Sequence, residues 1–313
     1  FSNDAKGALL LEPTRSNLVT YSEDFSQFTG GGSIVVESGY LAPDGTNSAY
    51  KVSGSAGALN MGFGLTNSET RSIYAKTISG QGNAHLCSYF GNTNNLKTIT
   101  EDWQRFEVNG TTTETGVTSF YAVDFRGSTD LNEIIIWGAQ AEQGSYATSY
   151  IPTQGSAVTR SADVCNNGGN EQVINSTEGV LYAEISALAN DFTNRTIGIL
   201  GDSSNLIELA YRNTTNQLRV LIKSSNVFVV NFQHTLSDIT SYNKIALKYK
   251  NNDCSLWING LKVLTDTSAN MPSGLSELNF NRFDGAEDFY GNVKDLRVYN
   301  TALTDTELQA LTT

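Results

Sequence analysis

The chain has 313 residues, of which 39% are hydrophobic and 10% aromatic, so it can bury a sizeable core and is long enough for two domains. Its formal net charge is −12 and no cluster of Lys or Arg is visible, which argues against nucleic-acid binding and against docking on anionic lipid. No apolar run approaches the roughly 20 residues that cross a bilayer, so we expect no membrane insertion.

The first half of the chain consists of short alternating segments separated by turn residues. Strands are expected at 8–11, 33–37, 50–53, 71–78, 85–90, 103–108, 120–125 and 134–137. In the clearest of them, Ile73 and Ala75 lie on one face, with Tyr74 and Lys76 on the other. Strands at this short, regular spacing predict an antiparallel sandwich rather than a βαβ fold.

The segment from Glu133 to Asp163 changes character part-way along and indicates a domain boundary. Its apolar run ends at Gly138, and polar, turn-rich residues follow. We therefore expect a first domain over 1–153, an ordered connector over 154–176 and a second domain over 177–313. Tyr146, Tyr150 and Ile151 are expected to keep this region packed.

The second half repeats the strand pattern with a different sequence. Strands are expected at 180–186, 196–200, 206–212, 217–223, 227–232, 244–250, 254–258, 261–264, 277–282 and 292–299. Asn259-Gly260 separates two apolar strands and predicts a type I′ hairpin, because both residues tolerate positive φ. Thr304 and Glu307 have the spacing of a capping box, which predicts a short helix over 305–311.

Two blocks in the first half resemble sequences of tailed-bacteriophage and prophage proteins. GALLLEPTRSNLVTYSEDFSQF at Gly7–Phe28 and IIIWGAQAEQGSYATSYIPT at Ile134–Thr153, followed by AVTRSADV, are similar to blocks of tail-fibre and other virion proteins. The resemblance implies a phage surface protein whose first domain is a carbohydrate-binding-module-like β-sandwich. It implies no particular ligand.

Two segments of the second half resemble the concanavalin A-like, laminin-G-like jelly-roll superfamily. They are Leu256-Trp257-Ile258-Asn259-Gly260 and the terminal stretch Tyr290–Thr304. Members of this superfamily bind sugars, bind proteins or hydrolyse glycans, so the resemblance implies a fold and leaves the function open. The expected fold class is all-β, with two antiparallel β-sandwich domains of the jelly-roll, lectin-like kind.

Catalytic motifs are missing from the sequence. Only two histidines occur, His85 and His234, and neither an H-E-x-x-H nor a G-x-S-x-G motif is present. Glycanases of the concanavalin A-like fold typically carry two acidic residues alternating on one strand, and the best local candidate, Glu184, has no second carboxylate beside it. We expect the protein not to be an enzyme.

Sugar binding requires aromatic rings beside planar polar groups. Tyr74, Lys76, His85, Trp103 and Arg105 lie on strand faces opposite the expected core, and they would form an aromatic and basic patch if their strands were neighbours. The alternative is that Trp103 packs under a loop and that Tyr74 is an ordinary half-buried strand residue. In the second domain Trp257 is a further candidate, with packing on a neighbouring strand as its alternative.

Metal and thiol chemistry have few candidates. Sandwich modules of both resembled families often carry a structural ion, and the loop carboxylates that could bind calcium are Asp44, Asp202, Asp284 and Asp288. Each of them is better explained as a turn former, and no ligand is assigned. No cofactor is required. The cysteines, Cys87, Cys165 and Cys254, show neither a disulfide framework nor zinc spacing, so we expect free thiols in a chain made in a reducing cytosol.

The functional expectation is a non-enzymatic virion surface protein, a tail fibre or capsid fibre that adheres to host or environmental polysaccharide. It would be made in the host cytoplasm and would contact other virion proteins, with a homotrimer as the state usual for tail fibres. The chain begins with Phe and shows no signal peptide, which we read as a fragment or a processed product. The alternatives are a purely structural capsid or tail decoration protein and a secreted bacterial polysaccharide-binding module.

Overall fold

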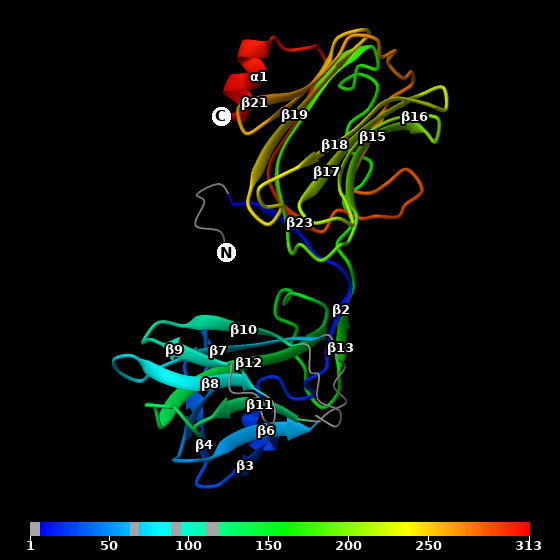
Figure 1. The fold of residues 1–313 in the computed structure, drawn as a ribbon. Helices are drawn as coiled ribbons and strands as arrows, with labels where there is room; N and C mark the ends of the chain where they lie inside the picture. The colour runs from blue at the N-terminus through cyan, green and yellow to red at the C-terminus, as the bar shows by residue number, and fades with distance from the viewer. Residues whose placement is uncertain (1–6, 63–68, 89–94, 111–118) are drawn as a thin grey trace. The chain divides into compact units, whose positions relative to one another are not determined.

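Antiparallel strands make up most of the chain and assemble into two β-sandwich units (Figure 1). The computed structural model describes residues 7–62, 69–88, 95–110 and 119–313. Unit 2 is Thr14–Ser161, and unit 1 combines the residues up to Pro13 with Ala162–Thr313. The expected fold class, all-β with two antiparallel sandwiches, is confirmed.

Unit 2 contains two five-stranded sheets and a small strand pair. One sheet has the order β10-β7-β12-β5-β4, the other has the order β3-β6-β11-β8-β9, and β13 pairs with β2. The elements are β2 (Arg15–Asn17), a 3-10 turn η1 (Phe25–Gln27), β3 (Thr29–Gly31), β4 (Val35–Tyr40), β5 (Ala49–Ser53), β6 (Ala58–Gly62), β7 (Glu69–Lys76), β8 (Gly82–Ser88), β9 (Leu96–Ile99), β10 (Gln104–Gly110), β11 (Ser119–Asp124), β12 (Glu133–Gln143) and β13 (Val158–Arg160).

The core of unit 2 lies between its two five-stranded sheets. Ile73 and Ala75 on β7 and Ile134 on β12 are fully buried in it, as are Leu86 on β8 and Phe120 on β11. Because side chains alternate along a strand, the residues between these on β7 and β12 point out of the sandwich. The two faces predicted for the 71–78 strand are confirmed.

Unit 1 has one six-stranded and one five-stranded sheet, in the orders β1-β23-β14-β19-β20-β21 and β18-β17-β16-β15-β22. Its apolar core draws buried residues from both sheets. The elements are β1 (Leu9–Leu11), β14 (Glu178–Ala187), β15 (Arg195–Asp202), β16 (Asn205–Tyr211), β17 (Gln217–Ser224), β18 (Val227–Thr235), β19 (Asn243–Lys250), β20 (Cys254–Ile258), β21 (Leu261–Asp266), β22 (Glu277–Asn279), β23 (Gly291–Tyr299) and α1 (Asp305–Thr312).

The domain boundaries differ from those expected. The first strand, β1, belongs to unit 1, where Leu9 pairs with Val293 of β23 and Leu11 enters the core. The expected connector, 154–176, is divided: β13 pairs with β2 in unit 2, whereas Gly168 pairs with Leu278 in unit 1. Unit 2 is thus an insertion in unit 1. The sequence does not reveal the insertion, because a short apolar strand such as β1 can pair with either sheet system equally well by its own residues.

Local signals in the second half gave the right structures. Asn259 and Gly260 have φ of 48° and 82° and connect β20 to β21, which confirms the type I′ turn. The Thr304 and Glu307 capping box is present at the start of α1. The three cysteines are free, as expected. Within the residues described, no helix is both long and apolar enough to cross a membrane.

Candidate functional site

Four of the predicted site residues share one surface of unit 2. Tyr74 and Lys76 project from β7, Arg105 from β10, and Trp103 directly precedes β10, all on the outer face of the β10-β7-β12-β5-β4 sheet. Arg105 pairs in register with Tyr74, and Tyr74 pairs with Trp137 of β12. The structure therefore brings Tyr74, Lys76, Trp103 and Arg105 together as an aromatic-basic patch.

One face of each ring in this patch is covered by a cation of the same patch. The Lys76 ammonium lies 5.9 Å from the centre of the Trp103 ring, and the Arg105 guanidinium lies 5.6 Å from that of Tyr74. Both are cation–π distances, so each ring has one face occupied. Stacking of a sugar on that face would first require the cation to move.

The other two candidates lie elsewhere. His85 is on β8, in the opposite sheet of unit 2; it points away from the core and is only 8% exposed, near Gly127. Trp257 is in unit 1, 7% exposed, and packs in a cluster with Leu308 of α1. Neither belongs to the patch. For Trp257 the packing alternative applies, because helix α1 covers the outer face of its strand.

Beside the patch, three rings form an aromatic cluster, Tyr74, Trp137 and Tyr150. The ring centres of Trp137 and Tyr150 are 4.6 Å apart, and those of Tyr74 and Trp137 are 5.3 Å apart. Gly138 lies between them with φ of +65°, and a Cβ there would come within 3.3 Å of both tyrosine rings. Glycine is therefore favoured at this position by the backbone conformation, and a larger residue would also have to displace the tyrosine rings slightly.

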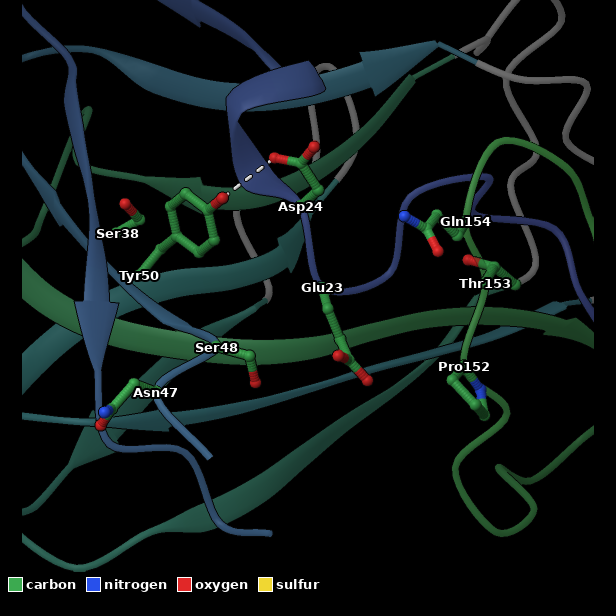
Figure 2. A pocket seen from close by; sticks show the side chains of 9 residues that line it. All are labelled: Glu23, Asp24, Ser38, Asn47, Ser48, Tyr50, Pro152, Thr153 and Gln154. Carbon is green, nitrogen blue, oxygen red and sulfur yellow. Dashed lines mark hydrogen bonds between the residues drawn. The ribbon is translucent and has the colours of Figure 1, made fainter. Parts of the chain in front are cut away.

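A pocket of about 470 Å³ lies in the same unit (Figure 2). Its volume falls within the range of small-molecule sites. Nearly all of its lining side chains are polar, and they come from the η1 region, the β4–β5 segment and the chain after β12. They are Glu23, Asp24, Ser38, Asn47, Ser48, Tyr50, Pro152, Thr153 and Gln154.

The aromatic cluster holds two of the pocket's side chains in place. The indole Nε1 of Trp137 donates a hydrogen bond to Ser48 Oγ at 2.8 Å. The Tyr150 hydroxyl lies 3.0 Å from Glu23 Oε1 and 2.6 Å from Ser22 Oγ, so its single hydrogen can be donated to Glu23 while the Ser22 hydroxyl donates to the phenol oxygen. Burial, with the charge of Glu23 adding to it, raises the pKa of Tyr150, so this hydroxyl stays protonated and remains a donor.

Asp24 is the most firmly oriented acceptor of the pocket. Its Oδ1 accepts from the Ser26 hydroxyl at 2.5 Å, from Ser26 N at 3.1 Å and from the Tyr50 hydroxyl at 3.0 Å, the last bond being visible in Figure 2. These hydrogen bonds, that of the Ser26 hydroxyl first, lower the pKa of Asp24. Burial and the same contact raise the pKa of Tyr50. At neutral pH the pair is therefore a carboxylate and a phenol.

Other polar groups of the pocket are uncommitted. The side chains of Ser38, Asn47 and Gln154 have no hydrogen-bond partner within the described parts of the chain, and all three are exposed. Neither Glu23 nor Asp24 forms an ion pair with another described residue, and no Lys, Arg or His lines the pocket. The arrangement can thus accept hydrogen bonds through carboxylates and can both donate and accept them through amides and hydroxyls.

The pocket forms where the two sequence blocks Gly7–Phe28 and Ile134–Thr153 meet. Glu23 and Asp24 belong to the first block, and Pro152 and Thr153 to the second. Buried Asn17 joins the blocks by donating to the carbonyls of Ala139 and Ile151 and accepting from the amides of Val19 and Ala141. Sequence reasoning missed the pocket residues; the two blocks were the signal that could have indicated them.

The loop carboxylates considered for calcium accept hydrogen bonds from residues of their own loops. Asp44, Asp202 and Asp284 each accept a backbone amide two residues further on, and Asp288 accepts from the Tyr290 hydroxyl. Among the residues that the structure describes, no three His, Cys, Asp or Glu side chains gather as metal ligands. Glu184, the carboxylate considered for catalysis, forms an ion pair with Lys294 at 3.3 Å.

One family model matches the chain. Residues 185–309 match the concanavalin A-like lectin/glucanases superfamily. The match covers most of unit 1 and less than half of the whole chain, so it describes the fold of that unit: the lectin-like fold expected there is confirmed. No curated protein matches the sequence at a significant level.

Solved structures with a partial similarity to this chain include the following. The CBM40 of the Ruminococcus gnavus IT-sialidase bound to α2,3-sialyllactose is 16% identical, with a TM-score of 0.39 over 48% of this chain and 95% of that one. The leech intramolecular trans-sialidase is 19% identical, with a TM-score of 0.39 over 48% of this chain and 26% of that one. The SAP-like pentraxin of Limulus polyphemus is 11% identical, with a TM-score of 0.37 over 47% of this chain and 74% of that one. At these values the similarities identify no ligand for this chain.

Proposed function

We propose that the protein binds glycans through the pocket of unit 2 and does not cleave them. The observation that carries the proposal is the pocket itself, where carboxylate, amide and hydroxyl groups surround the Tyr50 ring and Pro152. Sugars are recognised by such planar polar groups, which hydrogen-bond to hydroxyls, together with apolar surfaces that contact C–H groups. The lectin-like fold of unit 1 is consistent with the same role.

Binding without cleavage is favoured by the state of Asp24, one of the two carboxyl groups that line the pocket. Glycoside hydrolases usually pair a carboxylate with a second carboxyl group that stays protonated as the general acid. The pKa of Asp24 is lowered, which suits an acceptor and not a proton donor. Burial raises the pKa of Glu208 in unit 1, but that side chain is 2% exposed and cannot reach a substrate in solution.

The same proposal includes a place on the surface of a phage particle, supported by the two sequence blocks that resemble virion proteins. The glycan would then be a polysaccharide of the host or its surroundings, and other virion proteins, with trimer formation, would anchor the chain. Immunogold labelling of particles and the mass of the purified chain test these points. Absence of label on intact particles would contradict the virion location.

A glycan array followed by calorimetry on the best ligand tests the binding itself. Asn47→Ala and Gln154→Ala should each weaken binding about fivefold to tenfold, because each removes a side chain whose hydrogen bonds are available to a ligand. Asn132→Ala is the matched control, since Asn132 is also exposed in unit 2 and does not line the pocket. No ligand on the array, or full affinity in both pocket variants, would contradict the proposal.

A further inference from the structure

The charge of the unit 2 pocket points to a class of sugar. Its lining includes two carboxylates, Glu23 and Asp24, and no cationic side chain. No ion pair with another residue in the described ranges neutralises either carboxylate. Since the pKa of Asp24 is lowered by its hydrogen bonds, that group keeps its charge well into the acidic range. A ligand entering the pocket therefore meets uncompensated negative charge.

The two carboxylates differ in how much of each remains for a ligand. Asp24 is saturated on Oδ1 by Ser26 and Tyr50, and Gln27 Nε2 lies 3.3 Å from Oδ2. Glu23 accepts one internal hydrogen bond, from Tyr150 to Oε1, and its Oε2 has none among the described residues. In Figure 2 the Glu23 side chain extends between Ser48 and Pro152. Glu23 is thus the group available for direct contact, while Asp24 supplies fixed charge.

This pattern discriminates between sugars by their charge. A carboxylate accepts hydrogen bonds strongly from an ammonium group and repels another anion. One opposite charge at about 4 Å contributes roughly fivefold in affinity even with water-like screening, and more where the pair is partly buried. Sugars that carry carboxylate, sulfate or phosphate meet the same effect with the opposite sign, and the pocket offers no Arg or Lys to hold them.

We propose that the pocket selects amino sugars with a free, protonated amine over their N-acetylated forms, and rejects uronic acids and other acidic sugars. The proposal rests on the proposed function and adds the chemical class of the ligand. Glu23 would accept from the ammonium group, while Asn47, Gln154 and Ser38 would bind ring hydroxyls.

Calorimetry on the full chain tests this selectivity at a mildly acidic pH, where the amine is protonated. The probes are oligomers of equal length built from glucosamine, N-acetylglucosamine and glucuronate, together with the galacto-configured series. The free amine should bind at least about tenfold more tightly than the N-acetyl form, and the uronate should not bind. The advantage of the amine should shrink as salt is added.

Glu23→Gln gives the decisive comparison, because it keeps the shape of the side chain and removes its charge. It should reduce the preference for the amine, measured as the ratio of the affinities for the amine and the N-acetyl form, about fivefold. The matched control is Glu133→Gln, the same change at an exposed carboxylate of unit 2 that does not line the pocket. Circular dichroism confirms that both variants are folded.

The outcomes separate this inference from the function on which it rests. Equal binding of amino, N-acetyl and uronate oligomers, or a preference that Glu23→Gln leaves intact, would overturn the charge selection while glycan binding stands. Failure of every probe, together with an empty glycan array, would overturn both.

Discussion

Replacing Asn17 with Ala should destabilise unit 2 strongly, because one amide joins both sequence blocks. The side chain is fully buried and makes hydrogen bonds of 3.1 and 2.9 Å to the carbonyls of Ala139 and Ile151. It also accepts from Val19 N and Ala141 N, each at 3.1 Å. At about 1 kcal/mol for each net hydrogen bond, and with backbone partners left buried, the loss is about 4 kcal/mol of unfolding free energy.

Urea unfolding followed by tryptophan fluorescence measures this loss, since Trp103 and Trp137 report on unit 2 and Trp257 on unit 1. Asn47→Ala is the matched control: Asn47 is exposed and has no side-chain partner within the described ranges, so its loss should change the free energy by no more than about 0.5 kcal/mol. A loss of unfolding free energy below about 1 kcal/mol in Asn17→Ala would refute the view that this amide holds the two sequence blocks together.

Three further predictions concern single side chains. Trp137→Phe keeps a ring in the aromatic cluster but removes the donor to Ser48, so calorimetry should show several-fold weaker glycan binding. The control is Trp103→Phe, which should bind normally because the Trp103 indole has no hydrogen bond to a described residue. Asp24→Asn should be less stable than the parent at neutral pH, because a carboxyl group with a lowered pKa stabilises the fold when it is ionised. Urea unfolding at several pH values should show the difference in unfolding free energy between parent and variant shrinking as pH falls through that lowered pKa. A difference that acid leaves unchanged would contradict the lowered pKa of Asp24. Glu208→Gln has the opposite sign: burial raises the pKa of Glu208, so ionisation of this group costs the parent stability as pH rises. The melting temperature of the variant, compared with that of the parent, should therefore be higher at pH 7 than at acid pH. A variant that melts below the parent at pH 7 would show that the contact with Arg219 outweighs burial.

Strands and local turns could be predicted closely from the sequence, because they depend on neighbouring residues. Alternation alone placed β7 and β10, and Asn259-Gly260 identified its hairpin. The assignment of β1 could not be predicted in this way, since it depends on pairing Leu9 with Val293 across the whole of unit 2. Likewise, nothing in the 85–90 segment shows that His85 lies in the sheet opposite to Tyr74.

The candidate site was predicted only in part, for a similar reason. Alternation correctly placed Tyr74, Lys76, Trp103 and Arg105 on one face, but it could not show that the cations would lie over the rings. The pocket depends on three segments that are distant in sequence, with Glu23, Ser48 and Thr153 as examples. Such polar loop residues have no periodic pattern, and only the tertiary structure brings them together.

The insertion of unit 2 has a consequence for biosynthesis. The ribosome delivers Thr14–Ser161 as a complete unit long before Gly291–Tyr299 exists, so unit 2 can fold while the Leu9–Leu11 strand still lacks its partner. During that interval the apolar Leu9–Leu11 segment has no strand partner for its backbone groups, and such unpaired strands are typical starting points for aggregation. A chain truncated before β23 would carry this hazard permanently, whereas a fragment limited to Thr14–Ser161 would avoid it.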